Sequence, residues 1–201
     1  MPTTALTRLL LIIIALAAIA AGAYTFQQIN QQPQQPTIYN RVPVFTLDNH
    51  LGKQITEQSL QGQWTLLFLG YTFCPDVCPT TLSLLNQLHQ QLPAEQPLNV
   101  LFVSVDPDRD SPERLNEYIR FFNDDFAAAT GTRSQIDQLT GSLYLPYRIG
   151  EPDSNGVYLV DHAGALTLIG PDLQVYKYFN PPHSVTELTE QISAIRDAAN
   201  G

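Results

Sequence analysis

The chain has 201 residues, a net charge of −9 at pH 7 and an apolar fraction of 44%, which suits one domain with a hydrophobic core plus terminal extensions. Its 10 Lys and Arg residues form no basic cluster, so the composition argues against a nucleic-acid partner. The 19 carboxylates are scattered rather than arranged in runs, which is typical of a solvated surface.

Residues 1–26 predict a membrane anchor. The uncharged run over 9–26 would span about 27 Å as a helix, enough to cross a bilayer core. Arg8 precedes this run and the next basic residue is Arg41. The positive-inside rule therefore predicts a single-pass protein of the inner (cytoplasmic) membrane, with its C-terminal domain on the periplasmic, extracytoplasmic side. Cleavage as a signal peptide near Ala21–Ala23 is the alternative, and either interpretation places the domain where disulfides are permitted.

Residues 27–37 are rich in Gln and Pro and predict a linker to a domain formed by residues 38–201. In that domain, the continuous apolar run Thr65–Thr72 predicts a central strand that is buried on both faces. A helix should follow, with Pro79 in its first turn and four leucines at helical spacing. Those leucines are Leu82, Leu85, Leu88 and Leu92.

The remainder of the chain predicts further strands and helices, so we expect an α/β fold with a mixed sheet flanked by helices. The order expected is strand, helix, strand, helix, helix, hairpin, helix. The predicted elements are a strand over 99–106, a helix after a cap at Asp110 or Ser111, a helix after the capping-box pair Thr132 and Gln135, two or three strands over 157–179 with a turn at 170–172, and a terminal helix after a second capping-box pair, Ser184 and Glu187.

Both cysteines of the chain, Cys74 and Cys78, directly follow the first of these strands. Residues four apart on a helix share one face, and a helix N-terminus stabilises thiolates. Thiolates can exchange disulfides and can also bind metals, so this spacing is compatible with both functions. Two thiolates are too few for a structural zinc site, whereas Cu(I) favours thiolate ligands and would need one more ligand to complete a low-coordinate site.

Four histidines are candidates for that further ligand. His162 ends a strand-like run and precedes Ala-Gly, a position that fits a functional histidine or a strand-end cap. His50, His89 and His183 lie in a predicted turn, on a helix and near a helix cap, where solvated or locally bonded histidines are expected.

Four segments resemble the Sco/SenC family, the membrane-anchored copper proteins of cytochrome c oxidase assembly. They are GYTFCPDVCP (70–79), VSVDPDRDSPERL (103–115), GTRSQIDQL (131–139) and YLVDHAGALTLIGPDLQVYKYF (158–179), and the resemblance extends over about residues 41–179. It implies a thioredoxin-like fold and a copper ion bound by Cys74, Cys78 and His162. Asp76 would tune the site or contact a partner, and Asp161 is either an acceptor that orients His162 or a surface carboxylate.

The resemblance predicts a copper chaperone rather than an enzyme. One copper ion, as Cu(I) or Cu(II), would pass by ligand exchange to the binuclear copper centre of cytochrome c oxidase subunit II or to another copper acceptor. The alternative is a membrane-anchored thiol–disulfide oxidoreductase in which Cys74 and Cys78 are the redox pair that reduces the acceptor's cysteines. His162 separates these hypotheses, because copper binding uses the imidazole and disulfide exchange needs only the sulfurs. A peroxidase and a purely structural disulfide are weaker interpretations.

Overall fold

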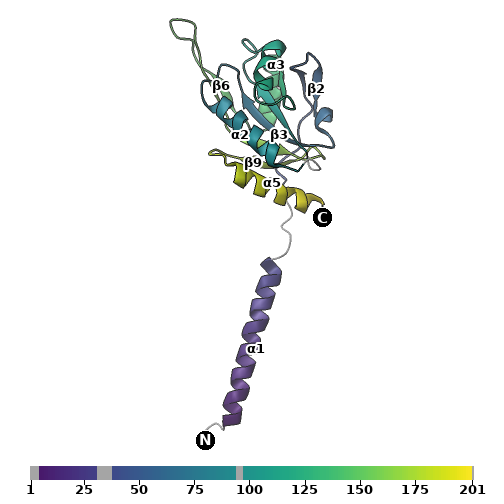
Figure 1. The fold of residues 1–201 in the computed structure, drawn as a ribbon, viewed down its shortest axis with the longest axis vertical. Helices are drawn as coiled ribbons and strands as arrows, with labels where there is room; N and C mark the ends of the chain where they lie inside the picture. The colour runs from purple at the N-terminus through teal and green to yellow at the C-terminus, as the bar shows by residue number, and fades with distance from the viewer. Residues whose placement is uncertain (1–4, 31–37, 94–96, 201) are drawn as a thin grey trace. The chain divides into compact units, whose positions relative to one another are not determined.

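The computed structural model describes residues 5–30, 38–93 and 97–200. The chain divides into two compact units, residues 1–35 and 36–201. In the first unit, α1 (Ala5–Asn30) confirms the predicted helix and includes residues 27–30 of the predicted linker, while residues 31–37 lie outside the described residues (Figure 1). Among the described residues no helix combines the length and the apolar character needed to cross a bilayer, so the predicted transmembrane span is not found there.

The second unit is built on a seven-stranded mixed sheet with the strand order β2-β1-β5-β4-β3-β8-β9. The three central strands run parallel to one another, and the strand pairs on either side of them are antiparallel. The bounds are β1 (Thr46–Asn49), β2 (Gln54–Thr56), β3 (Trp64–Gly70), β4 (Leu98–Ser104), β5 (Ala127–Thr130), β8 (Leu166–Ile169) and β9 (Val175–Phe179).

Within its described residues, this unit also contains four α-helices, a short 3₁₀ helix and a two-stranded ribbon. The helix α5 packs against α2, and the connection between the two ribbon strands extends beyond the rest of the domain (Figure 1). The helices are η1 (Glu57–Leu60), α2 (Val77–Gln91), α3 (Pro112–Arg120), α4 (Arg133–Ser142) and α5 (Val185–Asn200), and the ribbon pairs β6 (Tyr147–Ile149) with β7 (Val160–His162).

The core explains why β3 and α2 form where the sequence predicts them. Residues 66–69 of β3 are fully buried, because β3 lies between β4 and β8 in the middle of the sheet. Leu82, Leu85 and Leu88 of α2 are fully buried as well. Burial of each such leucine stabilises the fold by about 1.5–3 kcal/mol, so this strand and helix form a firm support for the loop that joins them.

The predicted starts of α3 and α4 are also confirmed. The Ser111 hydroxyl accepts a hydrogen bond from the backbone N–H of Arg114, so Ser111 rather than Asp110 caps α3. At α4, Thr132 and Gln135 form the predicted reciprocal capping box. The predicted order of elements omitted the hairpin of β1 and β2, the strand β5 and the ribbon strand β6, each of which has only three or four residues.

Candidate metal centre

Cys74 and Cys78 lie at the junction of β3 and α2, and only Cys78 is helical. Cys78 is the second residue of α2 and is fully buried, whereas Cys74 precedes the helix and is half-buried. The backbone N–H of Cys78 donates to the Cys74 Sγ at 3.4 Å, and the N–H of Cys74 donates to the Tyr71 carbonyl at 3.2 Å. The two sulfurs thus come together because the loop folds back onto the first turn of α2, and not through a shared helical face.

His162 approaches these sulfurs from a distant part of the chain. It ends β7, pairs with Tyr147 of β6, and places Nε2 3.4 Å from the Cys78 Sγ. Its Nδ1 lies 3.1 Å from the Ala163 carbonyl. A proton on Nδ1 would satisfy that carbonyl and leave the Nε2 lone pair directed at the sulfurs, the tautomer that a metal ligand needs. The candidate ligand atoms of Cys74, Cys78 and His162 all lie within 4.8 Å of one another.

The pKa values of the two thiols are shifted in opposite directions. The hydrogen bond from Cys78 lowers the pKa of Cys74 to about 3, and a hydrogen bond with His162 acts in the same direction. The pKa of Cys78 is raised, first by its hydrogen bond to the Cys74 sulfur and then by burial. At neutral pH the pair therefore holds one proton, on Cys78, and Cys74 is a thiolate.

Gly70, which did not stand out in the sequence, gives the buried sulfur its space. A Cβ atom added to this last residue of β3 would lie 2.8 Å from the Cys78 Sγ and 2.5 Å from Cε2 of Phe102. Both distances are shorter than ordinary carbon contacts, so any larger residue would push the sulfur away from the site. The signal that could have identified Gly70 is its position between an apolar strand and a reactive motif.

Asp110 was considered in the sequence only as a helix cap, but it anchors the cysteine loop. Its fully buried carboxylate accepts hydrogen bonds from the Thr72 N–H at 2.9 Å, from the Thr72 hydroxyl at 2.6 Å and from the Ser104 hydroxyl at 2.5 Å. Because charge-assisted hydrogen bonds are the stronger kind, these contacts fix the chain two residues before Cys74 to the end of β4.

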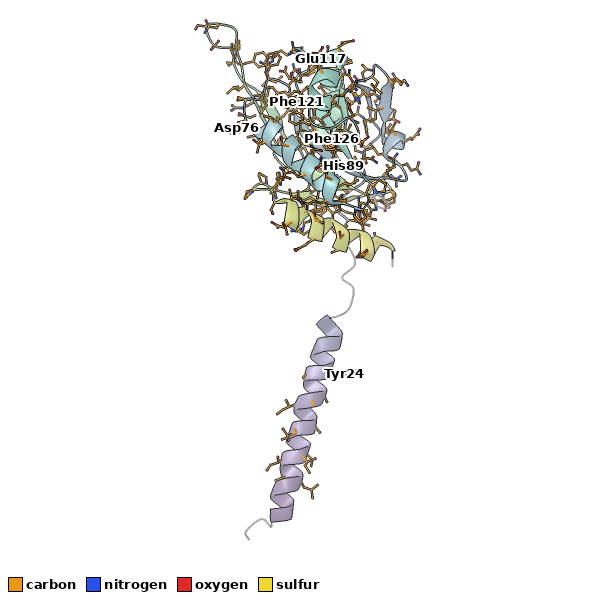
Figure 2. The ribbon with its side chains drawn as sticks, viewed as in Figure 1. Tyr24, Asp76, His89, Glu117, Phe121 and Phe126 are labelled. Atoms are coloured by element: carbon orange, nitrogen blue, oxygen red, sulfur yellow. The ribbon has the colours of Figure 1, made fainter. Side chains whose placement is uncertain are left out.

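The two aspartates that flank the candidate ligands do not join them. Asp161 forms an exposed ion pair with Arg148 at 2.7 Å, which supports the surface carboxylate of its two expected roles, because neighbouring residues of a strand point to opposite faces. Asp76 precedes α2 on the surface of the domain (Figure 2), and its carboxylate accepts a hydrogen bond from the Thr80 hydroxyl at 3.4 Å.

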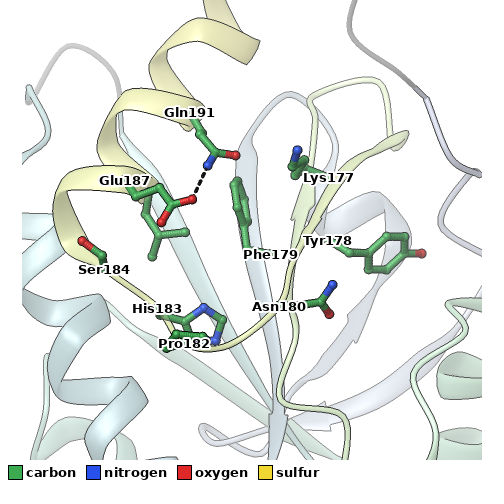
Figure 3. A pocket seen from close by; sticks show the side chains of 10 residues that line it. Lys177, Tyr178, Phe179, Asn180, Pro182, His183, Ser184, Glu187 and Gln191 are labelled. Carbon is green, nitrogen blue, oxygen red and sulfur yellow. Dashed lines mark hydrogen bonds between the residues drawn. The ribbon is translucent and has the colours of Figure 1, made fainter.

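The other three histidines lie outside the group of candidate ligands. The Nε2 atom of His183 lies 2.9 Å from the carbonyl oxygen of Gly164, and Gly164 is two residues beyond His162. His183 also lines a surface pocket of about 180 Å³ (Figure 3). The ring of His89 meets that of Phe126 edge-on at 5.7 Å (Figure 2). His50 accepts a hydrogen bond from the Ala128 N–H at 3.1 Å. Each of these rings contacts a residue that is distant in the sequence, whereas the sequence analysis expected solvated or locally bonded histidines.

Comparison with known proteins agrees with this geometry. The profile of the SCO1/SenC family matches residues 33–197. A protein of Stutzerimonas stutzeri is 34% identical over 158 residues, which make up 78% of this chain and 77% of that protein. The human protein SCO1 homolog, mitochondrial, is 34% identical over 152 residues, or 74% of this chain, and the match spans only 50% of the human protein.

A crystal structure of Arabidopsis thaliana ScoI with copper bound has the same fold. It superimposes with a TM-score of 0.72 at 32% identity, covering 77% of this chain and 98% of that one. The predicted thioredoxin-like arrangement, a mixed sheet flanked by helices, is therefore confirmed. Since the family profile covers most of the chain, this protein belongs to the SCO1/SenC family.

Proposed function

We propose that this protein binds one copper ion through Cys74, Cys78 and His162 and delivers it to an acceptor during assembly of cytochrome c oxidase. The observation that carries the proposal is the convergence of two sulfurs and one imidazole nitrogen within 4.8 Å. Membership of a family with a copper-bound structure supports copper as the ion.

The donor set suits copper better than the other common metals. Thiolate sulfur favours Cu(I), and imidazole serves Cu(I) and Cu(II) alike. Cys74 offers a thiolate at neutral pH without further change, because its pKa is lowered to about 3. Cys78 must release its proton when the metal binds, so loading the site releases about one proton at pH 7.

Delivery would follow by ligand exchange with sulfur ligands of the acceptor. The acceptor we propose is the binuclear copper centre of cytochrome c oxidase subunit II, with another copper protein as the alternative. Cys74 and His162 are each partly exposed, which gives an incoming sulfur access to the metal.

The proposal is tested by measuring the Cu(I) affinity of the full chain in detergent, reduced and anaerobic, by competition with a chelator. We expect one tightly bound ion and at least tenfold weaker binding for His162→Ala, a loss of about 1.4 kcal/mol. His183→Ala is the matched control, because it removes an imidazole that bonds the Gly164 carbonyl and lies outside the group of candidate ligands. Equal affinities for the wild type and His162→Ala would refute the three-ligand site.

A second candidate, a thiol–disulfide oxidoreductase, is favoured by the asymmetry of the pair. An accessible thiolate at Cys74 beside a buried thiol at Cys78 is the arrangement of an attacking and a resolving thiol. Cys74 would attack the acceptor disulfide and release one acceptor thiolate. Cys78 would then lose its proton and attack the Cys74 sulfur, releasing the second acceptor thiolate. The resulting Cys74–Cys78 disulfide would need a thiol reductant to return to the dithiol.

The same asymmetry makes the pair a weak reductant. A stabilised thiolate favours the reduced form, which raises the midpoint potential and opposes electron donation to a partner. A redox titration of the Cys74–Cys78 couple tests this argument. A midpoint at or below that of thioredoxin, about −270 mV, would favour the oxidoreductase, and a clearly higher midpoint would favour copper delivery.

We infer from the sequence that the N-terminal segment attaches the protein to the inner membrane and that the domain works outside the cytoplasm. The basis is the uncharged run over 9–26 with Arg8 before it and no basic residue after it until Arg41. Membrane fractionation, followed by protease treatment of intact spheroplasts, tests both statements. We expect a membrane-bound chain whose domain is digested from outside. Protection from the protease would show that the domain lies on the cytoplasmic side, opposite to the proposed orientation.

A further inference from the structure

We propose that Arg109 is a positioning residue. It holds the ribbon of β6 and β7, which ends at His162, against the loop between β3 and α2 that carries Cys74, and so allows the imidazole to join the two sulfurs. The proposal rests on the proposed copper site and adds a residue that contacts none of its candidate ligand atoms. The three elements that Arg109 joins are the loop after β3, the loop after β4 and the chain leading into β7.

The guanidinium group is held by hydrogen bonds on two sides. Its Nε donates to the Asp106 carboxylate at 2.5 Å, and its Nη1 donates to the Tyr158 carbonyl at 3.0 Å. Asp106 is fully buried and also accepts a hydrogen bond from the Tyr158 hydroxyl at 2.8 Å. Tyr158 is therefore tied to the end of β4 through its backbone and through its side chain.

The guanidinium also lies against three aromatic rings. Its Cζ is 3.6 Å from the centroid of Tyr158, 4.9 Å from that of Phe73 and 5.5 Å from that of Tyr71. Arginine combines such stacking with hydrogen bonding, and a cation within about 6 Å of the centroid of an aromatic ring is attracted to its face. One side chain thus lies over rings of the loop after β3 and of the chain leading into β7.

These rings connect Arg109 to the candidate ligands. Phe73 is the residue before Cys74, and Tyr158 lies four residues before His162. The ring of Tyr71 meets that of His162 edge-on, with the centroids 6.1 Å apart. Cys74 and Cys78 are fixed by their shared loop and helix, but His162 reaches them only if the ribbon of β6 and β7 keeps its place.

The interactions of Arg109 are not arranged for stability alone. Its Nη2 is buried and has no hydrogen-bond partner among the described residues, although the side chain as a whole is 19% exposed. An unsatisfied buried donor lowers the stability of the fold, because its hydration is lost without a replacement. An apolar residue would avoid that cost but could not link Asp106, Tyr158 and the aromatic rings at once.

The test is a double-mutant cycle between Arg109 and His162, read out as copper affinity of the full chain in detergent. If Arg109 acts through His162, Arg109→Ala should weaken binding about tenfold in the wild type and add almost nothing in a His162→Ala background. Arg120→Ala is the matched control, since its exposed ion pair with Asp124 belongs to α3 and its C-terminal end. It should bind copper like the wild type.

A second variant and a spectroscopic signal keep the test independent of folding. Arg109→Lys retains a cation beside Asp106 but lacks the planar fork that stacks on the rings. For both Arg109 variants in the Cu(II) form, we expect weaker nitrogen hyperfine coupling from His162 than in the wild type. In the metal-free variants we expect faster hydrogen exchange at the amides of residues 160–163. These signals should stay unchanged in Arg120→Ala.

The possible outcomes separate this proposal from the proposed function. If His162→Ala leaves copper affinity unchanged, the three-ligand site itself fails. If His162→Ala weakens binding while both Arg109 variants match Arg120→Ala, the site stands and the role of Arg109 is refuted. Equal losses from the Arg109 substitution with and without His162 would also refute it, because Arg109 would then act through the sulfurs.

Discussion

Gly70 shows how a single missing side chain shapes the candidate site. A Cβ atom at this position would lie 2.8 Å from the Cys78 Sγ and 2.5 Å from Phe102. Cys78 is fully buried, so its sulfur cannot move outward without disturbing α2. Room for the Cys78 sulfur therefore depends on a residue that offers no ligand atom.

We predict that Gly70→Ala destabilises the domain by about 1–3 kcal/mol, the usual cost of overpacking, and weakens Cu(I) binding by about tenfold. Denaturant unfolding and chelator competition measure the two effects. Gly141→Ala is the matched control, because a Cβ there meets no atom within 4 Å and alanine favours the helix α4. If Gly70→Ala bound copper as tightly as the wild type, the Cys78 sulfur would have more room to move than this packing suggests.

The low pKa of Cys74 leads to a second prediction, about the pH dependence of its alkylation rate. Its pKa is lowered to about 3 by the hydrogen bond from Cys78, so the thiolate is fully formed above pH 5 and is lost only as the pH falls toward 3. In the metal-free reduced protein, alkylation of Cys74 by iodoacetamide should therefore proceed at nearly the same rate from pH 5 to pH 8.

Peptide mass spectrometry of the alkylated protein measures that rate at each pH. In Cys78→Ala the hydrogen bond is absent and the pKa of Cys74 should rise toward its ordinary value. The variant should then react about tenfold faster with each pH unit up to about 8. The same steep rise in the wild type would mean that Cys74 is not a thiolate at neutral pH.

At the scale of elements, α4 offers a local prediction. The Thr132 hydroxyl accepts from the Gln135 N–H, and the Gln135 side chain accepts from the Thr132 N–H at 2.8 Å. Thr132→Ala should lower the free energy of unfolding by about 1 kcal/mol, because one N-terminal amide loses its acceptor.

Denaturant unfolding with an unchanged m-value, together with unchanged copper affinity, would confirm that the loss is local. Thr189→Ala serves as the comparison, since that hydroxyl only donates to the Val185 carbonyl within α5 and alanine is a better helix former. Equal destabilisation by both substitutions would argue against the capping explanation.

The elements also show what the sequence can and cannot predict. The strand β3 and the helix α2 follow from an apolar run and from leucines at helical spacing, which are local patterns. The strand β5 (Ala127–Thr130) was missed because alanine favours helices, and it is a strand because its backbone pairs with β4 and β1. Tertiary pairing of this kind leaves no local pattern in four residues.

The candidate ligands and their supports differ in the same way. Cys74 and Cys78 stand out in the sequence as the two thiols of one short motif, whereas His162 joined them as a candidate ligand through the resemblance to the Sco/SenC family. The contact of Thr72 with Asp110 joins residues 38 positions apart, and the stacking of Arg109 on Tyr158 joins residues that are separated by the helices α3 and α4 and the strands β5 and β6. Such contacts arise from the fold, so the sequence predicts the ligands better than it predicts what holds them.

For the whole molecule, copper should act as a stabilising ligand. A ligand present at about 100 times its Kd, and bound only by the folded state, adds about 2.7 kcal/mol. For a domain of this size we expect Tm to rise by about 5–11 °C on anaerobic addition of Cu(I). Differential scanning calorimetry measures the shift, which should be smaller in His162→Ala at the same copper concentration. A Tm that stays the same when Cu(I) is added would contradict binding at a site formed by folding.

The different exposure of the two cysteines also sets an order of events. Cys78 lies at the bottom of the site with no solvent exposure, whereas Cys74 and His162 lie at its rim. In the proposed delivery, a sulfur from another protein would arrive at the rim, so it would replace Cys74 or His162 first and Cys78 would be the last ligand to leave the metal. Copper transferred in this way would always be bound by one protein or shared by two, and the free ion would not have to enter the surrounding solution.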